Sequence, residues 1–214
     1  MLNKIMKKIQ NIYETNEKDC GKYTNMQVSG MNFHNSCYEV KGLGNVAIMK
    51  ITDDKGIMRM DTLIINPFEV DAPMLSYDCI QMMGTNILYL EPFDTTIEHT
   101  FGTSLLKNIQ DKYDQLLENN PQQERWYDHM RLEGTIFKKT SHTDLLQQML
   151  EEYYDAYLEA CQKSSSCPTE LKKQKAAVYS KGLIENGGPA TDPFLKAYGK
   201  ETTEDFFKHI LFGV

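Results

Sequence analysis

The sequence predicts an α+β fold, with helices on both faces of one central antiparallel sheet. Two observations lead to this prediction. Short β-rich runs joined by turn sequences fill residues 45–92, and from Ser104 onward the apolar residues recur at helical spacing. No internal repeat or low-complexity tract divides the 214 residues. We therefore expect a single domain over residues 1–214.

The chain is expected to start with an amphipathic helix. Residues 3–15 place three isoleucines on one side of such a helix. Residues 16–36 are polar and contain two glycines, so we interpret them as a loop. The segment "CYEVKG" that follows fits a short strand.

The next four runs form a predicted meander. "NVAIMKI" and "IMRMDTLIINP" are joined by "TDDKG", and "PMLSYDCIQM" and "NILYLEP" are joined by "MGT". Turn residues between β-rich runs are typical of hairpins. At least four antiparallel strands are therefore expected between Asn45 and Pro92.

The second half of the chain is predicted to be mainly helical. Helices are expected over residues 104–118, 143–162, 168–183, 192–199 and 203–211. Pro168 suits the start of a helix, and Gly199 suits the end of one. The run "RLEGTIFKK" between these helices is expected to return to the edge of the sheet.

Composition excludes several classes of function. The net charge of −7 argues against general nucleic-acid binding, which relies on Lys and Arg to neutralise phosphates. The five cysteines include no C-x-x-C pair, so we expect a reduced chain in the cytoplasm. No secretory signal or membrane-spanning run is expected. The five histidines lack metal-ligand spacing, so no metal site is expected.

Asp78 is an unusual residue in the predicted strand "PMLSYDCIQM". Alternation of side chains places it on one face with Met74, Ser76, Ile80 and Met82. A buried ionised carboxylate is costly unless it is paired or its pKa shifts. One interpretation is that this face is exposed to water, and another is that Asp78 caps a neighbouring backbone group. The alternative is that Asp78 is an acid with a chemical role.

The order "INP…DAPMLSYDCI…NILYLEPFD" resembles the ferredoxin-dependent bilin reductases, which are related to the red chlorophyll catabolite reductases. In that family a strand ending in Pro precedes a D-x-P-x-x-x-x-D segment and a strand ending in L-x-P. The matching residues here are Pro67, Asp71, Pro73, Asp78, Leu90 and Pro92. The C-terminal run "GPATDPFLKAYGKETTEDFFKHILFGV" resembles the closing segment of the same family.

The resemblance implies a three-layer α/β/α sandwich with a tetrapyrrole pocket between the sheet and the C-terminal helices. It implies a monomeric enzyme without a tightly bound cofactor, which takes electrons from reduced ferredoxin. The substrate would be biliverdin IXα or a dihydrobiliverdin, and the product a phycobilin. The location would be the cytoplasm, or the plastid stroma in an alga.

The resemblance also assigns site residues. Asp78 occupies the position of the central catalytic aspartate, and Thr62 the position where some members hold a histidine or asparagine. Gly188 stands where many members keep a second aspartate, and Lys139 stands at an arginine position suited to substrate propionates. The expected substrate contacts are Met74, Ser76, Ile80, Asn66, Lys139, Asn186 and Gly188.

Three hypotheses follow. Asp78 favours a bilin reductase, in which a buried acid protonates the reduced tetrapyrrole. Thr62 and Gly188 do not readily transfer protons at neutral pH, which argues against a four-electron reduction and favours a non-catalytic bilin carrier of the same fold. The third hypothesis is an unrelated α+β binding module.

Overall fold

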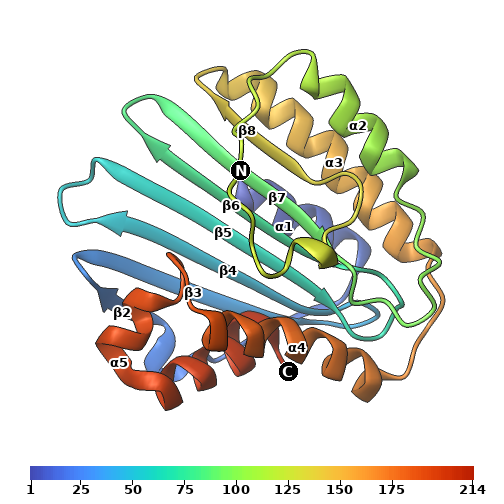
Figure 1. Cartoon of the computed structure of the whole chain (residues 1–214). Helices are drawn as coiled ribbons and strands as arrows, with labels where there is room; N and C mark the ends of the chain where they lie inside the picture. Colours follow the sequence, from blue (N-terminus) through green and yellow to red (C-terminus); the bar gives the residue numbers. More distant parts are fainter.

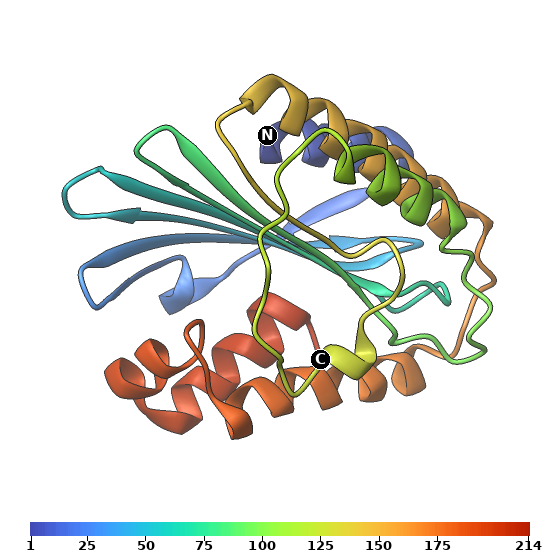
Figure 2. The ribbon, with the colours of Figure 1, turned by 45° about the horizontal axis from the view of Figure 1, so that its top comes forward.

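The computed structural model describes all 214 residues and contains one antiparallel sheet between two layers of helices (Figures 1 and 2). The helices are α1 (Leu2–Ile12), α2 (Ser104–Asp114), α3 (Thr143–Lys163), α4 (Thr169–Asn186), α5 (Asp192–Asp205) and the π-helix η3 (Phe206–Phe212). In Figure 2, α1, α2 and α3 lie above the sheet, and α4, α5 and η3 lie below it. The predicted α+β fold is confirmed.

The sheet has eight strands, and each pairs with its neighbours in the antiparallel sense. The strands are β1 (Thr15–Lys18), β2 (Asn25–Val28), β3 (Met31–Val40), β4 (Gly44–Asp53), β5 (Met58–Pro67), β6 (Met74–Met82), β7 (Thr85–Phe93) and β8 (Ile136–Thr140). Their order is β1-β3-β4-β5-β6-β7-β8. β2 also pairs with β3, along the first part of that strand, while β1 pairs along its last part. The predicted meander is therefore β4 to β7, and the predicted edge strand is β8.

Alternation along β6 explains why the sheet is covered on both sides. Leu75, Tyr77 and Cys79 are buried in the apolar core that α1, α2 and α3 share with the sheet. Met74 belongs to the second core, on the side of α4, α5 and η3. Asp78 has the same parity as Met74 and therefore points to that second side. We call this side of the sheet the site face.

The prediction of a loop over residues 16–36 is wrong. This region contains β1, the short helix η1 (Gly21–Tyr23), β2 and the first part of β3. Along β3, Phe33, Asn35 and Cys37 are buried while the residues between them are not. The polar residues that suggested a loop are the solvent-facing half of paired strands. β2 and β3 form a tight hairpin, and β1 pairs with the far end of β3.

The C-terminal helices are fastened to the sheet by two buried asparagines. Asn66 on β5 donates a hydrogen bond of 2.7 Å to the carbonyl of Phe212, and Asn45 on β4 donates one of 3.2 Å to the carbonyl of Leu211. Gly199 has φ of 76° and interrupts α5, as expected for a break at that position. No helix is both long and apolar enough to cross a lipid bilayer.

Candidate functional site

The structure brings Asp78 and Thr62 together. They lie directly opposite each other on β6 and β5, and the hydroxyl group of Thr62 donates a hydrogen bond to Oδ1 of Asp78. The same cross-strand row continues to Tyr89 on β7 and Phe137 on β8. A single row across four strands of the site face therefore holds one carboxyl group, the hydroxyl group of Thr62 and two aromatic rings.

Burial gives Asp78 the properties of a weak acid. The residue is only partly exposed, and desolvation raises the pKa of its carboxyl group to about 6, although the hydrogen bond from Thr62 acts to lower it. A carboxyl group with this pKa holds a proton in a substantial fraction of molecules near neutral pH. The arrangement can therefore deliver a proton to a bound molecule and recover it from solvent.

A second buried acid, Glu91, lies on the site face next to this row. Glu91 on β7 pairs with Ser76 on β6 and is 7% exposed. Desolvation raises the pKa of Glu91 to about 7, while the ion pair with Arg131, at 2.7 Å between Nε and Oε1, acts in the opposite direction. Sequence analysis missed Glu91, although alternation along "NILYLEPF" places it on the same face as Tyr89 and Phe93.

Four aromatic residues cover the site face beside these acids: Phe93, Trp126, Tyr127 and Tyr179. We call them the aromatic cluster. Tyr179 on α4 packs against Phe93 with ring centroids 4.5 Å apart, and Tyr127 packs against both of these rings, at 5.6 and 5.5 Å. The cluster fixes the segment before β8, which Figure 1 shows in front of the sheet, to helix α4.

Gly182 on α4 makes room for the tryptophan. A Cβ atom at this position would lie 2.6 Å from Cζ2 and Cζ3 of Trp126, far inside contact distance. Trp126 therefore rests on the backbone of α4, and its ring centroid lies 5.8 Å from that of Tyr179. Arg131, which leaves the same segment, lies 5.0 Å above the ring of Tyr127 and reaches Glu91.

Toward the hairpin ends of β6 and β7, the site face is apolar and only partly covered. Ile80, Ile87, Tyr89 and Phe137 all keep partial exposure on this face. Lys139 on β8 pairs with Ile87, so it stands at the edge of this apolar area, with an exposed side chain. A flat apolar surface with a carboxyl group at one side and a cation at its edge suits a large, conjugated, anionic ligand.

The remaining residues assigned from the sequence are more dispersed. Met74 is fully buried beside Phe93, its partner on β7, and Ser76 is 9% exposed beside Glu91. Asn66 is fully buried and holds the C-terminal helix, as described above.

Asn186 and Gly188 lie in and after the last turn of α4. Asn186 is exposed and donates a hydrogen bond to the carbonyl of Gly182, and the N–H of Gly188 donates one to Asp192. No hydrogen bond joins either residue to Asp78. The structure therefore groups the strand residues and leaves these two in a separate turn.

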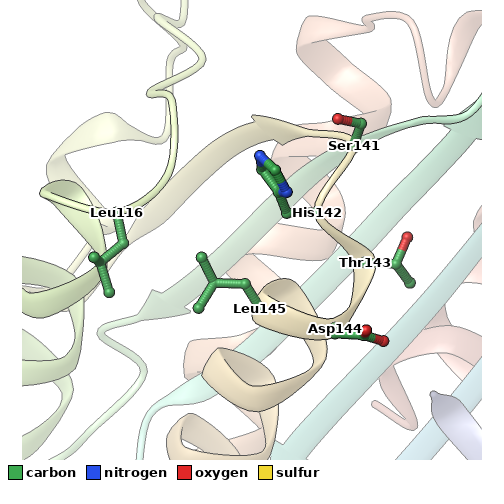
Figure 3. Close-up of a pocket in the computed structure, with 6 residues that line it drawn as sticks. All are labelled: Leu116, Ser141, His142, Thr143, Asp144 and Leu145. Atoms are coloured by element: carbon green, nitrogen blue, oxygen red, sulfur yellow. The ribbon is translucent and has the colours of Figure 1, made fainter.

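A large surface recess lies elsewhere in the molecule (Figure 3). It has a volume of about 520 Å³ and is formed where β8 leads into α3. Its lining consists of Leu116 and the consecutive residues Ser141, His142, Thr143, Asp144 and Leu145. None of these comes from β5, β6 or β7, so this recess is not part of the site around Asp78.

Comparisons with known proteins bear on the family and the fold of the chain. The model of a family described as ferredoxin-dependent bilin reductase matches residues 3–213. Among solved structures, the chain is similar to phytochromobilin synthase from tomato in complex with biliverdin, with a TM-score of 0.74 and 13% sequence identity. This similarity covers 99% of the present chain and 81% of the tomato chain, and at this identity it shows a shared fold. A comparison with curated protein sequences found no significant match.

Proposed function

Because the chain belongs to the ferredoxin-dependent bilin reductases, we propose that it reduces an open-chain tetrapyrrole with electrons from reduced ferredoxin and a proton from Asp78. The substrate is biliverdin IXα or a dihydrobiliverdin, and the product is a phycobilin. The observation that carries this proposal is the partly buried Asp78, whose pKa is raised to about 6, at the border of an apolar area of the sheet.

The site face offers the contacts that such a pigment needs. A bilin is a long conjugated molecule with two propionate groups, so it binds best where apolar side chains border a cation. Ile80, Ile87 and Tyr89 supply apolar surface, and Lys139 stands at its edge. In the solved structure to which this chain is similar, the bound molecule is biliverdin.

Asp78 supplies the proton in the proposed reaction. Each electron that enters the conjugated system makes it more basic, and a carboxyl group in contact with it can then protonate a carbon or nitrogen atom. Thr62 is a positioning residue, because its hydroxyl group holds Oδ1 of Asp78 and leaves the other carboxyl oxygen free to meet the pigment. The carboxylate then recovers a proton from water.

We propose a two-electron rather than a four-electron reduction. Gly188 carries no acid at the position where many members of the family keep a second aspartate. Thr62 does not titrate near neutral pH. The chain therefore has fewer proton-transferring groups than a longer series of reductions would use.

The test is to mix the purified protein with biliverdin under anaerobic conditions and record absorbance spectra. We expect a spectral shift on binding, and then loss of the biliverdin band with formation of a new pigment only after reduced ferredoxin is added. A bound spectrum that persists with reduced ferredoxin would instead identify a carrier. No spectral change at all would contradict both functions.

A further inference from the structure

Glu91 has the features of a second acid of the same site. Its side chain leaves β7 on the site face, one cross-strand row from Asp78, with Ser76 as its register partner. It is 7% exposed, and only one of its oxygen atoms, Oε1, forms a hydrogen bond. Oε2 makes none. A buried carboxyl group with one unengaged oxygen is available to exchange a proton.

Three charged groups act on Glu91: Arg131, Asp78 and Asp128. Arg131 donates a hydrogen bond to Oε1 of Glu91 and also forms an ion pair with Asp128, and its guanidinium group lies over the ring of Tyr127. The charge of Asp78 acts on Glu91 across the sheet and raises its pKa further. Arg131 alone among these groups favours the ionised form.

We propose that Glu91 is a second proton donor for the bilin, an inference that rests on the proposed function. A two-electron reduction takes up two electrons and two protons. Two reduced ferredoxins supply one electron each, Asp78 supplies one proton and Glu91 the other, and both carboxylates are protonated again by water. Glu91 thus supplies the second of the two protons that a two-electron reduction takes up.

The chemistry also requires an acid that works near neutral pH. Burial raises the pKa of Glu91 to about 7, close to the value that is best for general acid catalysis in a neutral solution. The ion pair with Arg131 keeps the side chain in one orientation, and the stacking of Arg131 on Tyr127 holds the guanidinium group in place. Glu91 therefore combines a fixed position with a useful acidity.

The test compares Glu91→Gln with wild type in a single turnover with biliverdin and reduced ferredoxin. Glutamine keeps the shape and removes the proton. We expect biliverdin to bind with unchanged affinity, a partly reduced radical species to accumulate, and formation of the final product to slow by about 10²-fold. Glu98→Gln is the matched control, because Glu98 is exposed and close in sequence.

A second variant measures the same role independently of Glu91 itself. Arg131→Gln removes the cation that lowers the pKa of Glu91, so the alkaline limb of the rate against pH should move to higher pH. A merely structural ion pair would leave that limb in place. If the Glu91→Gln protein cannot bind biliverdin, the pH–rate profile of Arg131→Gln tests the inference in its place. An alkaline limb at the same pH as in wild type would overturn the inference.

The outcomes separate this inference from the proposed function. Wild-type protein that gives no reduced bilin contradicts the proposed function. If the wild type reduces biliverdin and Glu91→Gln does so with the same rate and pH profile, only the role of Glu91 is contradicted, and the proposed function stands.

Discussion

Replacing Asp78 by Asn is expected to slow reduction of biliverdin by about 10² to 10⁴-fold, the usual contribution of a general acid. Asparagine keeps the size of the side chain and can still interact with Thr62, but it has no proton to give. Electrons from ferredoxin should still reach the pigment. We therefore expect a coloured radical species to accumulate, which absorbance and electron paramagnetic resonance would detect.

Asp61→Asn is the matched control for this experiment. Asp61 precedes Thr62 on β5 and pairs with Cys79, so its side chain points to the opposite side of the sheet. We expect its turnover to stay within about twofold of wild type, because its half-buried side chain does not reach the site face. Asp78→Asn protein that binds biliverdin and reduces it at the wild-type rate would remove Asp78 from the mechanism.

Replacing Tyr179 by Ala is expected to lower the free energy of unfolding by about 3–5 kcal/mol, as in other truncations of a large buried aromatic residue. Tyr179 is 6% exposed and contacts Phe93, Trp126 and Tyr127. For a chain of this length the loss lowers the melting temperature by about 10 °C. Trp126 is the single tryptophan, so its emission should shift to longer wavelength in the folded variant.

Two variants act as controls for the role of Tyr179. Tyr179→Phe keeps the ring, and because the hydroxyl group of Tyr179 makes no side-chain hydrogen bond, we expect nearly wild-type stability. Val178→Ala changes the neighbouring residue on α4, which is 62% exposed, and should alter stability by less than about 0.5 kcal/mol. If urea unfolding shows that Tyr179→Ala changes the free energy of unfolding by less than about 0.5 kcal/mol, the aromatic cluster does not stabilise the fold.

Local signals in the sequence were sufficient for the sheet around Asp78. The turns "TDDKG" and "MGT" fixed the two hairpins, and period-two alternation fixed the face to which Asp78 points. The break at Gly199 was also visible, because a positive φ favours glycine. These features depend on residues that are adjacent in the sequence, so they can be predicted from the sequence alone.

Features that depend on distant partners were not visible. Residues 16–36 look polar, and β1 becomes a strand only by pairing with the far end of β3, beyond the β2–β3 hairpin. Glu91 looks like an ordinary strand glutamate until Arg131, 40 residues away, is brought against it. The aromatic cluster likewise unites β7, α4 and the segment before β8, and no sequence spacing relates these three.

The strand residues that the resemblance assigns lie together in the structure, whereas Asn186 and Gly188, at the end of α4, do not join them. Asp78 and Thr62 share one hydrogen bond in the structure. Asn186 and Gly188, which the resemblance also assigns, form hydrogen bonds within their own segment. Strand register is set by the meander, whereas a turn between helices tolerates shifts of a few residues, so positions carried over to such a turn are less secure.

The most direct test of the central claim is a titration of the Asp78 carboxyl carbon by ¹³C nuclear magnetic resonance, with Asp78→Asn used to assign the signal. The claim is that burial keeps Asp78 protonated to a much higher pH than an exposed aspartate. We expect a midpoint near pH 6, because burial raises the pKa of this group to about 6. A midpoint close to 4, the ordinary value of an exposed aspartate, would contradict the account.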